Sequence, residues 1–166
     1  MSTSVLDDRR SGTFTASSGA TWRCFTDAVR GGVSTGWMSV ETIDGRAALA
    51  LHGQVSLAHN GGFVQMALDL PAPPAAGVHG IEFDVHGNGR RYGLHLRTAD
   101  MTAPRQAWRA RFDAPPRWQT LRLPWSGFEP HRTPGALEPV RIRRIGLLAI
   151  GEPGEVALNL GRIAFW

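Results

Sequence analysis

The stretch GIEFDVHGNGRRYGLHLR, residues 80–97, carries the clearest structural signal in the chain. Apolar and polar residues alternate with a period of two on both sides of a central Gly-Asn-Gly. Successive side chains of a strand point to opposite faces, so this alternation is typical of a half-buried β-strand. It predicts strands over 80–87 and 92–97 joined by a hairpin turn. The side chains expected to face inward are Ile81, Phe83, Val85, Tyr92, Leu94 and Leu96.

The same alternation recurs along the chain, and sustained helical periodicity does not. It appears in FVQMALDL (63–70) and WRARF (108–112), and on both sides of Asp44-Gly45, a favoured hairpin dipeptide. RIRRIGLLAI and EVALNLGRIAFW are expected to form a closing pair around the turn GEPG. Twenty Gly and eleven Pro are spread over 166 residues, as many short strands joined by turns require. The sequence therefore predicts one all-β domain over 1–166, a jelly-roll sandwich of two antiparallel sheets.

Charge and cysteine content limit the partners and the compartment. The net charge is +4, and all 18 basic residues are arginine, which reflects a GC-rich genome more than a binding signal. Without a basic helix or a long basic run, nucleic acid is not an expected partner. Cys24 is the single cysteine and excludes an internal disulfide. No secretory signal or membrane-spanning apolar run is recognised, so we expect a bacterial cytoplasmic protein with no integral membrane segment.

Catalytic and metal sites are not favoured by the residue spacing. The six histidines include no His-x-His or His-x-x-x-His pair, so a zinc site is not predicted. Calcium binding in a loop stays open, but the acids are too dispersed to nominate ligands. GVSTG at 32–36 matches the letters of a nucleophile motif around Ser34, yet a strand follows it where that motif needs a helix. We expect no catalytic residue and no cofactor, and we rank a hydrolase using Ser34 or a carboxylate pair last.

A polar face on three alternating segments is the candidate ligand or partner site. If 80–87, 92–97 and 108–112 are neighbouring strands, their outward side chains line one groove on a curved sheet. Such a groove suits a sugar, an acidic peptide or a protein partner. A solvated sheet face with cross-strand ion pairs is the competing interpretation. The candidate residues are Asp84, His86, His95, Arg97, Arg109 and Arg111.

Ordered motifs over about 22–166 resemble the complex I intermediate-associated protein family. They are Trp22, DAVRGGVS (27–34), GQVS (53–56), NGGF (60–63) and GNGRRY (87–92), with LPWSGFEP and the closing strands after them. Two positions depart from the family pattern: Arg30 stands where the family has Met, and Asn88 where it has Asp. The family-motif residues, expected to be mainly structural, are Trp22, Asp27, Gly31, Gly32, Ser34, Asn60, Gly61, Gly62, Phe63, Gly87, Gly89, Arg90 and Tyr92.

This resemblance implies a galactose-binding-like jelly roll, related in shape to carbohydrate-binding modules, and a non-catalytic role in assembling respiratory complex I. The first functional hypothesis is therefore a binding or assembly module with a protein partner. The alternative is a carbohydrate-binding module that uses the concave sheet face, with Trp37, Trp108 or Trp125 as an exposed stacking platform. The glycine doublets are expected to shape strand entries, with Asp27 and Ser34 capping free N–H groups.

Overall fold

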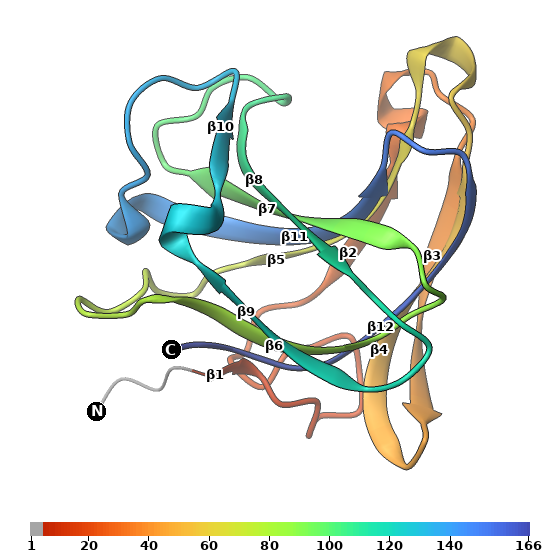
Figure 1. The fold of residues 1–166 in the computed structure, drawn as a ribbon, viewed down its shortest axis with the longest axis horizontal. Helices are drawn as coiled ribbons and strands as arrows, with labels where there is room; N and C mark the ends of the chain where they lie inside the picture. Colours follow the sequence, from red (N-terminus) through yellow and green to blue (C-terminus); the bar gives the residue numbers. More distant parts are fainter. Residues whose placement is uncertain (1–4) are drawn as a thin grey trace.

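The computed structural model describes residues 5–166 and consists of two antiparallel β-sheets packed face to face (Figure 1). The first sheet has the order β3 (Thr35–Ile43), β4 (Arg46–Val55), β12 (Gly154–Phe165), β6 (Gly80–His86) and β9 (Gln119–Pro124), with β1 (Val5–Asp7) pairing β12. The second has the order β10 (Glu129–His131), β8 (Ala107–Asp113), β7 (Arg91–Thr98), β11 (Ile142–Ile150), β5 (Phe63–Asp69) and β2 (Arg23–Thr26). The predicted jelly-roll sandwich is confirmed.

The connections between strands include four short 3₁₀ turns. They are η1 (Asp27–Arg30), η2 (Ala58–Asn60), η3 (Trp125–Gly127) and η4 (Pro139–Arg141). Residues 5–166 contain no helix that is both long and apolar enough to cross a bilayer.

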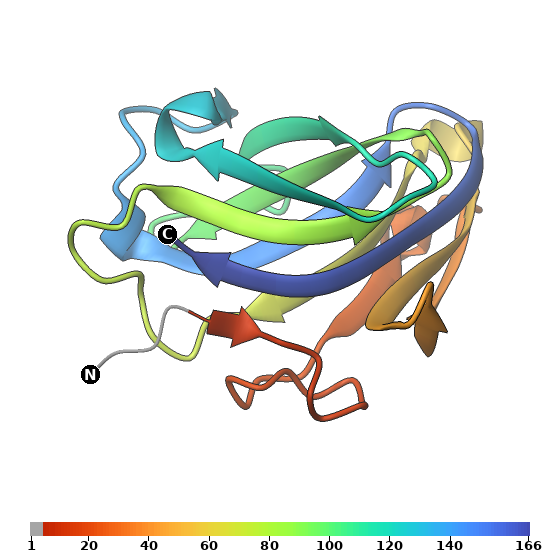
Figure 2. The ribbon, with the colours of Figure 1, turned by 60° about the horizontal axis from the view of Figure 1, so that its bottom comes forward.

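The core lies between the two sheets and is filled by the alternating apolar side chains. Figure 2 shows β9, β6 and β12 crossing in front of the strands of the second sheet. Ile81, Phe83 and Val85 of β6 are fully buried. The rings of Phe83 and Phe112, which belong to different sheets, meet edge to face at 5.0 Å. Alternation along each strand therefore fixes which side chains enter the core and which remain on the outer faces.

Two turns that the sequence predicts as hairpins are instead connections from one sheet to the other. β6 and β7 are joined by 87–90, but β6 lies in the first sheet and β7 in the second. Likewise β11 and β12, on either side of 151–153, pair with other strands and not with each other. Both predictions were wrong because a tight turn between alternating segments is compatible with a hairpin or with a crossover between packed sheets. The hairpin predicted at Asp44-Gly45 is confirmed, since β3 and β4 pair up to Ile43 and Arg46.

A buried charge cluster fastens the N-terminal segment to the sandwich. Asp7, at the end of β1, is fully buried, and Arg9 is 3% exposed. One carboxylate oxygen of Asp7 accepts from Arg9 Nη1 at 2.6 Å and from the Trp22 indole N–H at 2.8 Å. The other accepts the backbone N–H groups of Arg9 and Ser17. Trp22 of the family motif thus anchors residues 5–22 through its ring nitrogen as well as its buried ring.

Candidate functional site

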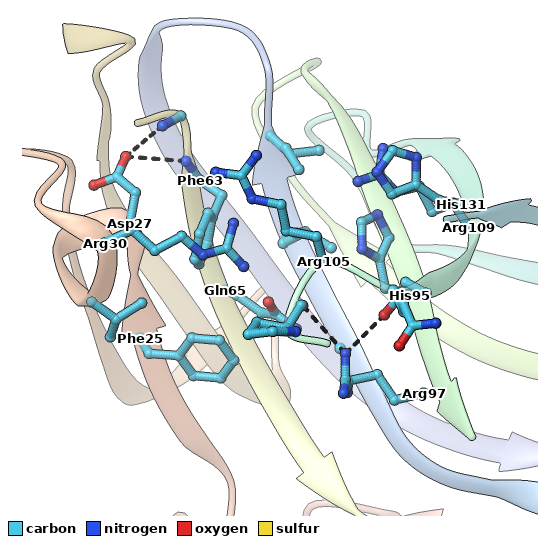
Figure 3. A pocket seen from close by; sticks show the side chains of 18 of the residues that line it. Phe25, Asp27, Arg30, Phe63, Gln65, His95, Arg97, Arg105, Arg109 and His131 are labelled. Atoms are coloured by element: carbon cyan, nitrogen blue, oxygen red, sulfur yellow. Dashed lines mark hydrogen bonds between the residues drawn. The ribbon is translucent and has the colours of Figure 1, made fainter. Parts of the chain in front are cut away.

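The two glycine doublets meet around the carboxylate of Asp27, which is 1% exposed. Asp27 Oδ1 accepts the Ser34 N–H at 3.0 Å. Its Oδ2 accepts the Ser34 hydroxyl and the Gly62 N–H, both at 2.5 Å, and the Phe63 N–H at 3.3 Å. Figure 3 shows the contacts with the 62–63 backbone. A single side chain therefore fastens the 31–34 segment to the start of β5, which lies far away in sequence.

In each doublet, one position needs glycine because its φ is positive, and the other needs glycine because a Cβ would collide with a neighbouring atom. Gly31 and Gly62 have φ of 85° and 140°, values that side chains rarely adopt. A Cβ on Gly32 would overlap Asp27 Oδ1, and one on Gly61 would lie 2.5 Å from Asp27 Oδ2. The doublets therefore let two loops wrap closely around a buried carboxylate.

We expect Gly31→Val or Gly62→Val to lower the free energy of unfolding by about 1–3 kcal/mol, because valine is strained at positive φ. Thermal melting should show a fall of several degrees in Tm for either variant. Gly127→Ala is the matched control, since its Cβ would meet only Pro124 at 3.7 Å and its φ is ordinary. A Tm of either valine variant equal to that of the control would contradict this account of the doublets.

Ser34 has no nucleophile geometry. Its side chain is buried, its hydroxyl donates to Asp27, and the same oxygen accepts the Ser56 N–H at 2.9 Å. Within residues 5–166, no histidine hydrogen-bonds to this hydroxyl. Burial alone would raise the pKa of the Asp27 carboxyl, but the hydrogen bonds from Ser34, Gly62 and Phe63 outweigh it and hold that pKa below its ordinary value. The structural role that the sequence predicts for both residues stays a prediction, which these contacts favour.

A cleft of about 680 Å³ lies directly beside the Asp27 loops, on the outer face of the second sheet. Its floor comes from the outward side chains of β2, β5, β11, β7 and β8 (Figure 3). One wall is η1 with the 60–62 loop, and the other is formed by the 102–106 loop and residues 131–132. The two walls come from sequence-distant loops, whereas the floor is a rigid hydrogen-bonded sheet. We call this site the basic cleft.

The lining of the basic cleft is strongly cationic. It includes two histidines, His95 and His131, and a single acid, Asp27, whose oxygens are occupied by backbone and hydroxyl donors. The arginines of the lining are Arg30, Arg97, Arg105, Arg109, Arg132 and Arg144. Of these, Arg144 alone forms a salt bridge within residues 5–166, with Asp69 at 2.8 Å. The remaining five guanidinium groups bring positive charge to the cleft that no carboxylate of the described chain neutralises.

Three of these five arginines differ in the contacts that their side chains make. Arg97 Nη1 donates to the carbonyls of Ala103, Pro104 and Gln106 and so holds the 103–106 loop in place. Arg30 packs its guanidinium over the Phe63 ring at 5.4 Å. Arg109 has a buried Nε with no hydrogen-bond partner in the described chain.

Burial and, after it, repulsion between neighbouring cations lower the pKa values of several of these groups. Burial, followed by the charges of Arg109, His131 and Arg111, lowers the pKa of His95 from 6.5 to about 3, so its imidazole is neutral at pH 7. Burial and the neighbouring Arg105 lower the pKa of Arg30. The same causes act on Arg109, where Arg111 and Arg132 are the neighbouring charges. An anion bound in the cleft would relieve this repulsion.

The structure separates the six residues predicted for one groove. His95, Arg97 and Arg109 line the basic cleft. Arg111 lies on the same face of β8, two residues from Arg109, but outside the lining. Asp84 and His86 lie on β6 of the first sheet, where Asp84 accepts from Thr120 and His86 contacts Asp44. The condition on which that groove depended is not met, since 87–90 carries the chain from β6 in the first sheet to β7 in the second.

The sequence predicted three of the eight arginine and histidine side chains that line the basic cleft and missed the other five. In the sequence, Arg30 is marked only as a departure from the family pattern, and Arg144 stands in the predicted strand RIRRIGLLAI with no signal of its own. Arg105, His131 and Arg132 lie in the long connections MTAPRQ and EPHRTPGALEP. Connections of that length are where binding residues concentrate, so a signal existed, although nothing in the sequence showed that both segments reach the same sheet.

The GNGRRY motif lies outside the cleft and stabilises the crossover between the sheets. The Tyr92 hydroxyl donates to Asn88 Oδ1 at 2.7 Å and accepts the Ala157 N–H at 3.1 Å. Gly89 has a φ of 85°, and a Cβ on Gly87 would collide with Ala114. Arg90 donates to the Glu152 carbonyl. Over residues 5–166, no group of three or more His, Cys, Asp or Glu side chains is placed to hold a metal ion.

Comparison with known proteins gives a family match and a set of structural neighbours. The sequence profile of "Complex I intermediate-associated protein 30 (CIA30)" matches residues 12–160. No curated protein sequence matches the chain. The family 11 carbohydrate-binding module of a cellulosomal cellulase of Clostridium thermocellum is similar in structure, with a TM-score of 0.73 and 14% identity over 99% of this chain and 94% of that one.

Two further solved structures have the same architecture. The family 11 module from Clostridium thermocellum in complex with a β-1,3-1,4-mixed-linked tetrasaccharide has a TM-score of 0.72 and 14% identity, covering 97% of this chain and 94% of that one. TmCBM61 in complex with β-1,4-galactotriose has a TM-score of 0.55 and 12% identity, covering 100% and 99% of the two chains. At such low identity the likeness establishes the galactose-binding-like jelly-roll fold and nothing about ligands.

Proposed function

Because the chain belongs to the complex I intermediate-associated protein 30 (CIA30) family, we propose that it is a non-catalytic module that binds a protein partner in the basic cleft. The observation that carries this proposal is that the family motif builds one wall of the cleft. DAVRGGVS contributes Asp27, Val29 and Arg30 to the lining, and NGGF contributes residues 60–63. Because the family motif shapes a cavity large enough for a ligand, it supports a binding role for that cavity.

The arrangement of the cleft also supports binding over catalysis. Its one carboxylate is held by Ser34, Gly62 and Phe63, and so is not free to act as a general base. Burial lowers the pKa of His95, on the floor of the cleft, to about 3. Its imidazole is therefore unprotonated near neutral pH and has no proton to donate as a general acid. The second histidine of the lining, His131, also has a lowered pKa, because of burial and the charges of Arg109 and Arg132. The remaining ionisable side chains of the lining are arginines, which stay protonated and serve recognition rather than proton transfer.

A steric block of the cleft floor tests this proposal. Gln65 lies on the outer face of β5 within the lining, so Gln65→Trp should fill the cleft without entering the core. Gln54→Trp is the matched control on the outer face of the first sheet. We expect proteins of the native host that co-purify with the immobilised wild-type chain and the Gln54→Trp variant to be lost with Gln65→Trp. Capture of the same set by all three chains would refute the cleft as the partner site.

The identity of the captured proteins tests the assembly role separately. Respiratory-chain subunits or their assembly intermediates, lost on Gln65→Trp, would support a role in complex I assembly. A cleft-dependent set without them would retain the binding function and remove the assembly role.

A second candidate, sugar binding, is supported by one exposed aromatic ring and by the fold. Trp37 on β3 is 56% exposed and stacks on His52, with ring centroids 5.3 Å apart and planes 16° apart. This platform lies on the outer face of the first sheet, opposite the basic cleft. The other two tryptophans named as platforms are unsuitable, because Trp108 is buried and Trp125 is half-buried with its N–H donated to the Val78 carbonyl.

Titration with a β-1,3-1,4-mixed-linked tetrasaccharide, the ligand of one structural neighbour, tests the sugar hypothesis. Binding that is lost in Trp37→Ala and kept in Gln65→Trp would establish a sugar site on the first sheet. Absence of heat in calorimetry at millimolar sugar would remove this candidate.

A further inference from the structure

We propose that the occupant of the basic cleft is an acidic peptide segment of the partner, with apolar side chains between its carboxylates. This inference rests on the proposed binding function and specifies its ligand. The first reason is charge: Arg30, Arg105, Arg109 and Arg132 line the cleft, and within residues 5–166 none of them has a carboxylate within salt-bridge distance. Planar guanidinium groups bind carboxylates in a bidentate geometry that lysine does not offer.

The positions of these cations favour a ligand with more than one anionic group. Arg30 on η1 and Arg105 on the 102–106 loop influence each other electrostatically across one end of the cleft. Arg132 lines a smaller hollow together with Arg30 and Arg105, and its charge also acts on a second group, Arg109 on β8 and His131. Figure 3 shows Arg105 extending toward Arg30 at one end of the cleft, and Arg109 beside His131 at the other. A chain with carboxylates at intervals can reach both groups, whereas a single small anion reaches one.

The floor between the cationic groups distinguishes a peptide from an acidic sugar. Leu148, Ile150 and Phe25 line it, and Val29 on the adjoining wall is 70% exposed. Aliphatic side chains of a peptide would gain from contact with this surface. The described lining residues include no Trp or Tyr, and the Arg30 guanidinium lies over the Phe63 ring at 5.4 Å, so Phe25 is the one uncovered ring of the lining on which a sugar could stack. Charge and apolar floor together favour an acidic peptide over a uronic-acid polysaccharide.

The unpaired arginines imply a cost to the free protein that a structural role does not explain. Like charges held close together destabilise the folded state until a counter-charge arrives. Neutralising two of them should therefore leave Tm unchanged or raise it, while binding is lost. Loss of function with a gain in stability is the signature of groups retained for a ligand.

Fluorescence anisotropy with a dye-labelled eight-residue peptide of alternating Glu and Leu tests the proposal. We expect saturable binding that weakens as NaCl rises, because salt screens exposed charges, and no binding of the matching Gln/Leu peptide. Arg105→Gln with Arg132→Gln removes two exposed cations from the lining and should weaken binding at least about tenfold. Arg10→Gln with Arg117→Gln makes the same change in net charge away from the cleft, at two exposed sites, and should leave binding unchanged.

The competing outcomes are distinguishable. No binding of the Glu/Leu peptide, equal loss in both double variants, or a lower Tm of the cleft variant would each overturn the acidic-peptide inference. Tighter binding of an oligogalacturonate or of a single-stranded oligonucleotide than of the peptide would also overturn it, in favour of that polyanion. If the peptide fails but Gln65→Trp still abolishes capture of a partner, the proposed function survives and only its ligand chemistry is wrong.

Discussion

Asp27→Ala is expected to lower the free energy of unfolding by about 3–5 kcal/mol, because the substitution strands several buried donors at once. The N–H groups of Ser34, Gly62 and Phe63 and the Ser34 hydroxyl would lose their shared acceptor. Each unsatisfied buried donor costs about 1–3 kcal/mol, and water entering the vacated space recovers part of the sum. Urea unfolding should show a lower midpoint at an unchanged slope.

The control for this variant is Asp113→Ala. Asp113 is 70% exposed and pairs with Arg91 on the surface, so its loss should change stability by less than about 1 kcal/mol. A fall of 1 kcal/mol or less for Asp27→Ala would show that the two loops hold their positions without the carboxylate. The same variant should also disorder the wall of the basic cleft and weaken partner capture, since Val29, Arg30 and residues 60–63 depend on this anchor.

Acid should remove the contribution of Asp27 to the free energy of unfolding. Its hydrogen bonds hold the pKa of the folded carboxyl below that of the unfolded chain, about 3.9. The stabilisation is therefore fully present above that unfolded value and is lost as pH falls through the lower folded pKa. The advantage of the wild type over Asp27→Asn should be constant from pH 7 to about 5 and shrink below about pH 4. An advantage that stays constant down to pH 2 would contradict the assignment of this pH dependence to Asp27.

Asp7→Ala should cost a similar amount, about 3–5 kcal/mol, because it leaves the buried Arg9 guanidinium without its counter-charge. The Trp22 indole N–H and the Ser17 backbone N–H would lose their acceptor in the same step. The damage should begin in residues 5–22, which this cluster holds against the sandwich, so amide hydrogen exchange should accelerate there first. Chemical unfolding then measures the total loss.

Two further variants separate charge burial from general damage to the N-terminal segment. Asp8→Ala, the neighbouring acid, pairs with the exposed Arg10 at 3.3 Å and should cost less than about 1 kcal/mol. Asp7→Ala combined with Arg9→Met removes both buried charges, and its cost should fall short of the sum of the single costs by about 1–3 kcal/mol. Additive costs in this double-mutant cycle would show that the ion pair is not what fastens the segment.

The family motif could be identified from the sequence, but its chemistry could not. DAVRGGVS and NGGF are separated by 25 residues and carry no mark of mutual contact. Only the folded chain shows that Gly32 and Gly61 approach the same carboxylate from two sides. The sequence did predict that Asp27 and Ser34 serve structure, because a polar residue beside a doublet is a natural cap for free N–H groups.

The alternation of apolar and polar residues by itself determined that this protein is a β-sandwich, which side chains fill its core, and which are left on the outer faces. That information is local, since a strand turns successive side chains to opposite sides whatever lies next to it. The tertiary structure alone decided which strands are neighbours, and so placed His95 and Arg109 in the cleft and Asp84 and His86 on the opposite sheet. Strand pairing depends on hydrogen bonds and packing between distant segments, and so does the placement of the loops that bring Arg30, Arg105 and Arg132 together. A period of two in the sequence predicts neither of them, because it reports only which face of a strand each side chain occupies.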